Sequence, residues 1–305
     1  MALPSPGMLT SPLPGIDDAE WPRLPAHLPP VVDAHVHLFP DRVFDALWRW
    51  FRAHAWPIRY PLYSPDVIDF LLARGVDHLV ALHYAHRPGM AQALNRYMHE
   101  TTAENPRVTG LATVLPGEPG AGRILEEAFA LGLAGVKLHC HVQCFAPDAP
   151  ALDAVWRVCA DHDRPVVIHA GREPKSPAYA CDPHALCAAA AIERVLRRYP
   201  TLRLCVPHLG ADEFPDYVRM MHRYDTLWLD TTMVVGDYLP ADVPWDDALA
   251  RPERLMYGSD FPNIPYAYSR ELERLIERLP DPAARAAVLG GTARDFFGIS
   301  GCGSG

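Results

Sequence analysis

The sequence lacks the features of two large classes of protein. It contains no run of about 20 apolar residues, the length that a membrane helix needs. Its 28 basic and 37 acidic residues are not gathered into blocks of one sign, and the formal net charge is -9. A surface that follows nucleic-acid phosphates needs clustered positive charge. We therefore expect a protein that binds neither membranes nor nucleic acid.

Phosphate-binding loops and a secretion signal are also missing. No GxGxxG follows the first predicted strand, and no GxxxxGKS/T occurs anywhere in the chain. The first 15 residues have neither the basic segment nor the apolar core of a signal peptide. Seven cysteines are an odd number for a disulfide framework, and no second pair stands at zinc-finger spacing. We expect a cytoplasmic protein with reduced thiols.

The composition is typical of a globular protein, with 49% hydrophobic and 21% charged residues. The length of 305 residues suits two domains of about 150 residues or one α/β barrel of about 250. Residues 1–30 contain eight of the 32 prolines and no apolar periodicity, which predicts an extended arm. We expect one barrel domain over residues 31–300 and a short tail over 301–305.

Short apolar runs alternate with longer amphipathic segments from residue 31 almost to the C-terminus. Segments 41–54 and 272–279 have apolar residues at helical spacing and predict helices. The runs are apolar on nearly both faces, as in parallel strands buried under a layer of helices. Eight such units favour a closed (β/α)8 TIM barrel with C-terminal helices over an open doubly wound sheet. The predicted strands are 31–37, 76–83, 108–115, 134–139, 165–170, 202–208, 226–231 and 254–259.

Potential metal ligands stand at the C-terminal ends of four predicted strands, where a barrel of this type forms its active site. His35 and His37 end the first strand and point to the same side, because side chains alternate along a strand. His169, His208 and Asp260 end the fifth, sixth and eighth strands. A His-x-His pair alone is as well explained by two polar strand-end residues. The whole set predicts a site for Zn, Mn or Fe with a position open to water.

Five segments form an ordered set of motifs: VVDAHVHLF at 31–39, GVKLH at 135–139, PVVIHAG at 165–171, VPHLG at 206–210 and YGSDFP at 257–262. Together with the closing segment GGTARDFFG at 290–298, they cover almost everything after residue 30. This set resembles the amidohydrolase superfamily, and within it the amidohydrolase-related branch of metal-dependent TIM-barrel hydrolases and decarboxylases. The closing segment is a weaker match than the other five.

The resemblance implies a ligand set and a catalytic pair. His35, His37, His169 and Asp260 would bind a divalent metal ion, with zinc as the first expectation and manganese or iron as alternatives. His208 would lie beside the ion. A divalent ion lowers the pKa of bound water from about 15.7 to about 7. We expect Asp260 to accept the proton of this water, and His208 to polarise a substrate carbonyl or to stabilise its oxyanion.

Three residues are expected to bind substrate. Arg172, in the loop after the fifth strand, is suited to a bidentate pair with a carboxylate, although pairing with Glu173 is an equal alternative. His139, at the end of the fourth strand, and His83, after the second, are expected to line the pocket.

The fourth strand and the segment after it contain further potential ligands. Some relatives carry a carbamylated lysine on this strand that bridges two metal ions. For Lys137 we favour instead a pair with a neighbouring carboxylate. The ligand-rich stretch 139–144 fits no closed tetrahedral motif, so no second metal site is predicted there.

The expected function is that of a metal-dependent hydrolase that cleaves a C–O or C–N bond in a small lactone, ester or amide, including carboxylated ones. A nonoxidative decarboxylase is the alternative, because relatives use nearly the same ligands to cleave a C–C bond. Some of those relatives replace part of the first motif, whereas this chain has both His35 and His37. A noncatalytic metal-binding scaffold is a third reading. The resemblance also implies self-association into homo-oligomers.

Overall fold

The core of the protein is a ring of eight parallel strands. The computed structural model describes residues 15–238 and 243–300. Hydrogen-bonded pairs run in the order β1-β2-β3 and β4-β5-β6-β7-β8, and every pair is parallel. The strands are β1 (Val32–His37), β2 (His78–Leu82), β3 (Val108–Gly110), β4 (Val136–His139), β5 (Val166–His169), β6 (Leu204–Val206), β7 (Leu227–Asp230) and β8 (Leu255–Met256).

Two isolated parallel bridges join these two sheets at both edges. Ala112, just after β3, pairs with Val136 of β4. Phe261, after β8, pairs with Val36 of β1. Strand pairing therefore continues around all eight strands, and the predicted TIM barrel is confirmed.

All eight predicted strands are present, but the hydrogen-bonded ladders are shorter than the apolar runs that predicted them. The third run was expected to extend over 108–115, whereas β3 ends at Gly110. Leu111 and Val114 beyond it are fully buried. Apolar residues continue past the ladder because the chain there still crosses the protein interior, where burial does not require strand pairing.

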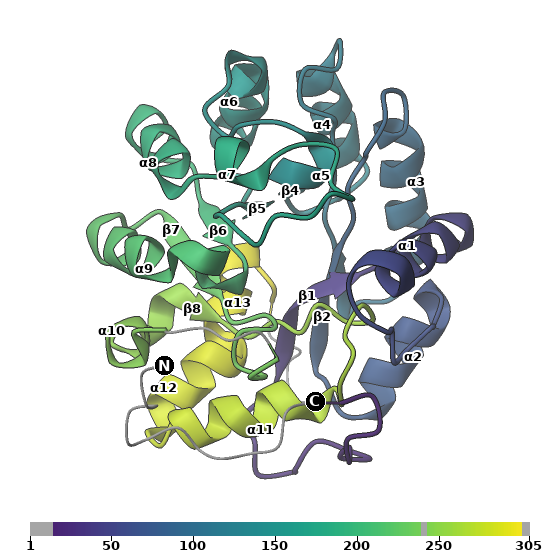
Figure 1. The fold of residues 1–305 in the computed structure, drawn as a ribbon, viewed down its shortest axis with the longest axis vertical. Coiled ribbons are helices and arrows are strands. Elements are labelled where there is room, and N and C mark those ends of the chain that lie inside the picture. The colour runs from purple at the N-terminus through teal and green to yellow at the C-terminus, as the bar shows by residue number, and fades with distance from the viewer. Residues whose placement is uncertain (1–14, 239–242, 301–305) are drawn as a thin grey trace.

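Helices surround the strands (Figure 1). The first helix, α1 (Asp41–His54), has the predicted bounds, and its Phe44 and Trp48 are buried. The short helices α5 (Cys140–Gln143) and α7 (Pro183–Leu186), which follow β4 and β5, contact each other. The remaining α-helices before the C-terminal segment are α2 (Ser64–Ala73), α3 (Ala91–Thr102), α4 (Ala121–Ala130), α6 (Asp153–Asp161), α8 (Ala189–Arg198), α9 (Phe214–Arg223) and α10 (Trp245–Leu249).

The C-terminal segment is helical, as predicted. It contains α11 (Ser269–Arg278), α12 (Pro282–Ala286), the π-turn η4 (Ala287–Gly291) and α13 (Thr292–Phe297). Short 3₁₀ helices are η1 (Pro150–Leu152), η2 (His208–Glu213) and η3 (Pro252–Arg254). None of the helices within 15–238 and 243–300 has the length and apolarity that crossing a bilayer requires.

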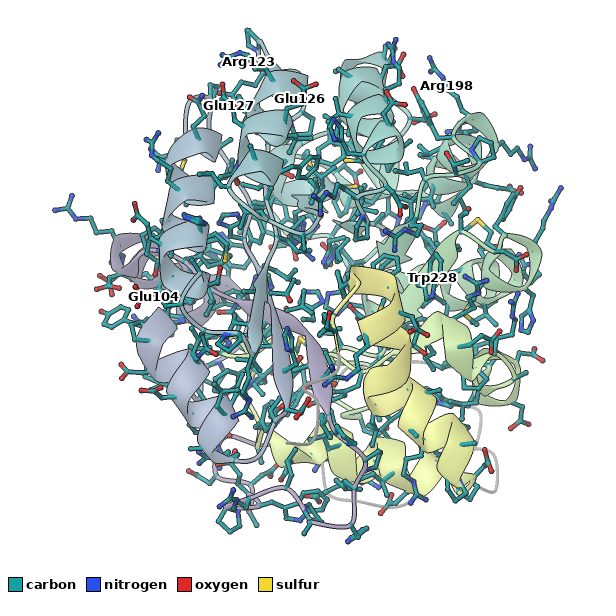
Figure 2. The ribbon with its side chains drawn as sticks, turned by 180° about the vertical axis from the view of Figure 1, so that it is seen from behind. Glu104, Arg123, Glu126, Glu127, Arg198 and Trp228 are labelled. Carbon is teal, nitrogen blue, oxygen red and sulfur yellow. The ribbon has the colours of Figure 1, made fainter. Side chains whose placement is uncertain are left out.

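The last helix, α13, covers the end of the barrel where the strands begin. Trp228 of β7, which is labelled in Figure 2, packs on Phe296 with ring centroids 4.9 Å apart. Arg203, just before β6, donates to the Phe296 carbonyl at 2.6 Å, and Arg294 pairs with Asp77, just before β2. Inward apolar side chains of the strands form one buried cluster with this helix. Because this end is filled with apolar side chains, polar chemistry is confined to the opposite end.

The described part of the predicted arm, residues 15–30, has neither helix nor strand and lies against the barrel. The backbone N–H of Trp21 donates to Ser269 Oγ at 3.1 Å, and the backbone N–H of Leu24 donates to the Arg74 carbonyl at 2.7 Å. Residues 1–14 of the predicted arm and the predicted tail 301–305 lie outside the described residues. The proposed domain boundaries remain a prediction.

Candidate metal centre

Two groups of buried potential ligands lie at the C-terminal ends of the strands. Within each group the ligand atoms are within 4.8 Å of one another. The first, here named the β1–β8 group, consists of His35, His37 and Asp260. The second, the β4–β5 group, consists of His139, His141 and His169.

Both imidazoles of the β1–β8 group approach one carboxylate oxygen. His37 Nε2 lies 3.0 Å from Asp260 Oδ1, and His35 Nε2 lies 3.4 Å from the same oxygen. The two residues therefore point to the same side of β1, as predicted. Asp260 has a φ of 64°, in the left-handed region that a residue with a side chain rarely adopts. Local strain of this kind is typical of functional sites.

Electrostatics keep the β1–β8 group ready to bind a cation. Burial alone would raise the pKa of Asp260, but the hydrogen bond from His37 and the nearby imidazoles outweigh burial and hold the pKa below its ordinary value. Burial and the charge of Lys137 lower the pKa of His35 far below its ordinary value. A carboxylate beside imidazoles is a donor set that suits divalent transition metals.

A second carboxylate orients His35. Asp230, at the end of β7, is buried and accepts from His35 Nδ1 at 2.9 Å. This bond places the proton on Nδ1 and leaves the Nε2 lone pair on the side of Asp260. The Lys137 ammonium, also buried, lies 3.4 Å from His35 Nε2, and burial lowers its pKa to about 8.

One glycine allows the segment after β8 to approach β1. A Cβ on Gly258 would lie 2.7 Å from His35 Cβ and 2.5 Å from Thr232 Oγ1, closer than real side chains come. The absence of a side chain at Gly258 therefore lets the chain that leads to Asp260 pass directly beside His35.

His208 lies between the two groups, with ring centroids 5.5 Å from His35 and 4.6 Å from His169. Its backbone has a φ of 55° at the start of η2, another left-handed residue. Burial and the neighbouring His169 lower its pKa to about 4, so the ring is neutral at pH 7. Its Nδ1–H donates to the Thr232 carbonyl at 3.0 Å. The Nε2 atom therefore carries a lone pair.

In the β4–β5 group the rings pack against one another. His139 and His169 are stacked, with centroids 4.0 Å apart and planes 13° apart, and His141 meets His139 edge-on at 4.5 Å. Burial is the main cause of a lowered pKa at both His139 and His169. Two of the three imidazoles are therefore neutral. The third, His141, faces a carboxylate.

That carboxylate is Glu173, from the loop after β5. Its Oε1 lies 2.5 Å from His141 Nδ1, and its Oε2 lies 3.4 Å from His169 Nε2. Burial would raise the pKa of Glu173, but the contacts with both histidines outweigh it and lower the pKa. For His141, burial is outweighed by the bonds to Cys187 and Glu173, and the pKa rises to about 9.

The predicted ligand set is brought together only in part. His35, His37 and Asp260 form one group, whereas His169 lies in the other with His139. His139 had been expected to contact substrate rather than to stand among potential ligands. Its role and that of His169 as metal ligand or substrate contact remain predictions.

The other expected substrate-binding residues, His83 and Arg172, are members of neither group. His83 is fully buried, and burial lowers its pKa to about 3. The Arg172 side chain is 46% exposed, and its Nε lies 3.9 Å from Glu213 rather than beside Glu173. The alternative pairing of Arg172 with Glu173 is therefore not the one seen, because Glu173 turns inward to the histidines.

Sequence reasoning gave no role to three residues of this region. Asp230 lies within the seventh predicted strand, 226–231, but no motif assigned it chemistry, and Glu173 was named only as a partner for Arg172. His141 was set aside because its neighbours fit no known metal motif. A usable signal was present: His139 and His141 repeat the His-x-His spacing of the first strand.

Aromatic rings enclose both groups. Tyr84 lies between them, with its ring 5.8 Å from His37 and 4.9 Å from His139. Tyr179, in the loop after β5, lies 4.6 Å from His141 and stacks on Trp50 of α1 at 5.8 Å. Rings from α1 and from the loop thus border the outer side of the β4–β5 group.

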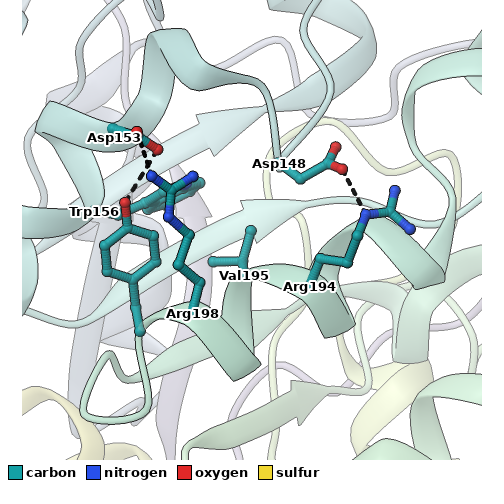
Figure 3. A pocket seen from close by; sticks show the side chains of 7 residues that line it. Asp148, Asp153, Trp156, Arg194, Val195 and Arg198 are labelled. Atoms are coloured by element: carbon teal, nitrogen blue, oxygen red, sulfur yellow. Dashed lines mark hydrogen bonds and ion pairs between the residues drawn. The ribbon is translucent and has the colours of Figure 1, made fainter.

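Two pockets lie near the surface. One of about 210 Å³ has its arginines already paired, Arg194 with Asp148 and Arg198 with Asp153, each at 2.6 Å (Figure 3). The other, of about 340 Å³, is lined by the loop after β5, including Cys181. The Cys181 thiol lies 3.2 Å from the His141 carbonyl oxygen, so this second pocket adjoins the β4–β5 group.

The β1–β8 group fits a divalent transition-metal ion. Its three ligand atoms are mutually close, Asp230 fixes the tautomer of His35, and Asp260 is held ionised. The buried Nδ1 of His37 has no hydrogen-bond partner among the described residues. Three protein ligands leave positions for water or substrate, as catalytic sites require.

Comparison with known proteins agrees with this architecture. Residues 32–299 match the family model described as Amidohydrolase. A comparison with curated proteins found no match. Among solved structures, 5-carboxyvanillate decarboxylase from Sphingomonas paucimobilis is 19% identical, with a TM-score of 0.64 over 88% of this chain and 99% of that one.

Two further solved structures are similar at the level of the fold. A dihydroxybenzoic acid decarboxylase from Polaromonas sp. JS666 with bound manganese is 15% identical, with a TM-score of 0.65 over 89% of this chain and 98% of that one. A probable 2-pyrone-4,6-dicarboxylic acid hydrolase from Acinetobacter baumannii is 18% identical, with a TM-score of 0.59 over 88% and 99%. The similar structures thus include decarboxylases and a hydrolase.

Proposed function

Since this chain belongs to the amidohydrolase family, we propose that it is a metal-dependent hydrolase that cleaves a C–O or C–N bond of a small molecule such as a lactone, ester or amide. One observation carries this proposal. The neutral His208, with its Nε2 lone pair free of the Thr232 bond, lies next to the β1–β8 group. A proton acceptor beside a cation site is the arrangement that activation of water needs.

The ion would be held by His35, His37 and Asp260. When bound, a divalent ion lowers the pKa of water to about 7 and polarises a carbonyl oxygen. Zinc suits two imidazoles and a carboxylate, and manganese, which the Polaromonas decarboxylase structure holds, is the alternative. The expectation that His169 is a fourth ligand remains a prediction.

The protein's own groups divide the proton transfers. His208 Nε2 accepts a proton, and the bond from its Nδ1–H to Thr232 stabilises the imidazolium that forms. Once protonated, His208 donates to the oxyanion, which it was expected from the sequence to stabilise. Asp260, ionised and bonded to His37, is the second proton acceptor. Asp230 keeps His35 in the tautomer whose Nε2 faces the ion.

The surroundings favour a small substrate with an apolar part. Tyr84 offers a ring face between the two groups beside His139, and Arg172 is exposed in the loop after β5, where it can pair with a carboxylate. The side chain of His83 is fully buried, and its expected contact with substrate remains a prediction.

A nonoxidative decarboxylase is the second candidate, and one observation favours it. The buried Lys137 ammonium, 3.4 Å from His35, is a positive charge that can neutralise a substrate carboxylate deep in the site.

The test supplies metal-loaded protein with panels of lactones, esters, amides and hydroxylated aromatic acids while proton release and carbon dioxide are followed. We expect proton release from lactones or esters, or free amine from amides, without carbon dioxide. Carbon dioxide from the aromatic acids, with no turnover of the other panels, would replace the hydrolase by the decarboxylase. No turnover of any panel by protein that retains its metal would favour the noncatalytic scaffold.

A further inference from the structure

We propose that Cys144 and Cys181 form a reversible disulfide that fastens the loop after β5 to the end of helix α5. The six cysteines that the structure describes are free thiols, and these two hydrogen-bond to each other. The bond goes beyond the proposed hydrolysis, because it is a modification of side chains that the reaction does not use. It needs neither substrate nor a metal ion to form.

The two thiols converge on one acceptor. Cys181 Sγ lies 3.2 Å from the carbonyl oxygen of His141, and Cys144 Sγ lies 3.5 Å from the same oxygen. Cys144 follows α5 directly, with its backbone in the left-handed region at a φ of 56°. Sulfur atoms that share a hydrogen bond can reach the S–S distance of about 2.0 Å by side-chain rotation and a small shift of the loop.

Both thiols are within reach of solvent. Cys144 is exposed, and Cys181 is partly buried at the edge of the pocket of about 340 Å³. A second hydrogen-bonded pair, Cys140 and Cys187, is fully buried. The oxidation of cysteines depends on exposure as well as on thiolate character. An oxidant dissolved in water therefore reaches Cys144 and Cys181 before the buried pair.

A peroxide is the class of oxidant for this step. Burial and the hydrogen bond with Cys144 raise the pKa of Cys181 to about 12, so Cys181 keeps its proton and Cys144 reacts first. The deprotonated Cys144 sulfur breaks the O–O bond and becomes a sulfenic acid, while the other oxygen leaves as hydroxide and takes up a proton. The Cys181 sulfur then attacks the Cys144 sulfur, and its proton leaves with the second oxygen as water. Two thiols are oxidised to one disulfide, and the peroxide is reduced to water.

The loop after β5 is anchored at both of its ends. Glu213 Oε2 accepts from the backbone N–H of Arg172 and from that of Ala189, each at 2.9 Å. Between these ends the loop reaches α1, where Tyr179 stacks on Trp50 with ring centroids 5.8 Å apart. A surface loop whose ends are held together can open locally while the rest of the fold stays intact.

A disulfide would add a covalent anchor near the middle of this loop. Cys181 stands two residues after Tyr179, whose ring lies 4.6 Å from His141 beside the β4–β5 group. Cys144 belongs to the segment that follows β4. The oxidised protein therefore keeps the loop closed against this side of the site, whereas the reduced protein lets it open. In this way the redox state controls access to the site.

The first experiment counts thiols and maps the bond. Reduced full-length protein is treated with hydrogen peroxide, denatured and alkylated, and its peptides are identified by mass spectrometry. We expect two alkylated thiols fewer than the seven of the reduced chain, Cys144 joined to Cys181, and recovery of both after addition of a dithiol. Cys181→Ser should form no disulfide. Cys159→Ala removes a buried thiol of α6 and is the matched control, which should still form the bond.

Limited proteolysis measures the effect on the loop. Lys175 is an exposed residue of the loop and offers a cleavage site to trypsin. Cleavage requires local opening, so we expect the oxidised wild type to be cut at Lys175 roughly tenfold more slowly than the reduced protein. In Cys181→Ser the two conditions should give the same rate.

Three results would overturn the proposal: a disulfide between Cys140 and Cys187, oxidation of Cys144 that stops at a sulfur acid, or equal cleavage of oxidised and reduced wild type. These measurements use no substrate. An inactive protein that forms the bond would sustain the disulfide and reject the hydrolase, and an active hydrolase that forms none would do the reverse.

Discussion

The two histidine groups use the same kinds of side chain but are supported differently. His35, His37 and Asp260 belong to β1 and to the segment after β8, which a parallel bridge and close packing at Gly258 hold together. The β4–β5 group takes His141 from the four-residue helix α5 and its carboxylate, Glu173, from a loop. Strand-borne ligands have fixed positions, whereas loop-borne ones can adapt.

The two groups also differ in where their carboxylates stand. In the β1–β8 group one carboxylate, Asp260, stands among the ligands and a second, Asp230, stands behind. In the β4–β5 group the only carboxylate in contact among the described residues, Glu173, stands behind its histidines. We therefore expect the β1–β8 group to hold the ion and to carry the chemistry.

The largest effect is expected from Asp260→Asn. This variant keeps the size of the side chain but removes the charge and the proton acceptor, so turnover should fall by about 10²–10⁴-fold. Steady-state kinetics with a substrate found by the panels measures it. Asp216→Asn, on the surface of α9, is the matched control. Wild-type turnover in Asp260→Asn would place the chemistry elsewhere and remove the difference between the groups.

Asp230→Asn tests the support behind His35. The amide cannot hold the His35 Nδ1 proton as a carboxylate does, so metal affinity of the β1–β8 group should fall about 10–100-fold. Competition with a chromophoric chelator measures the affinity. Unchanged affinity would show that Asp230 does not support a metal ligand.

Glu173→Gln tests the corresponding carboxylate in the β4–β5 group. Glu173 contacts His169, the expected fourth ligand, from a loop that can readjust around the amide, so the loss of metal affinity should be at the lower end, about 10-fold. The same chelator competition measures the affinity. A loss larger than that in Asp230→Asn would contradict the view that strands support their ligands more rigidly than loops.

The smallest effect concerns a buried histidine outside both groups, which serves as a reference. Burial and the nearby Arg294 lower the pKa of His78 to about 4, and its Nε2 bonds Thr109 at 2.8 Å. In the unfolded chain the pKa of this histidine is about 6.5. Its contribution to the free energy of unfolding is therefore complete above that pH and is lost as the pH falls towards 4.

Urea unfolding at pH 7 and pH 5 measures this reference. The wild type should lose roughly 1–2 kcal/mol more than His78→Gln between the two values, after allowance for partial exposure to solvent. Equal losses would show that proton binding at His78 is not coupled to folding.

Much of the architecture was predictable from local patterns. The eight apolar runs became eight strands, and α1 begins and ends where its helical spacing does. His35 and His37 share one face because alternation along a strand is local geometry. The contact of His37 with Asp260, 223 residues away, was predictable because the C-terminal ends of parallel strands gather at one end of a barrel.

The division of the ligands at the C-terminal ends of the strands into two groups was not predictable in this way. His169 ends β5, which pairs with β4, so its ring meets His139 rather than His35 on β1. Glu173 follows His169 by four residues, yet only the path of the loop turns it inward. A sequence shows that potential ligands stand at the C-terminal ends of strands, but the order of the strands around the barrel decides which of these ligands are neighbours.

By itself, therefore, the sequence determined the strands, their closure and the polar rim, because these follow from periodicities of two and 3.6 residues and from residues at strand ends. The tertiary structure alone decided which histidine shares which carboxylate. Those contacts depend on the circular order of the strands, on the absence of a side chain at Gly258 and on the path of one loop, and none of these is set by residues close in the chain.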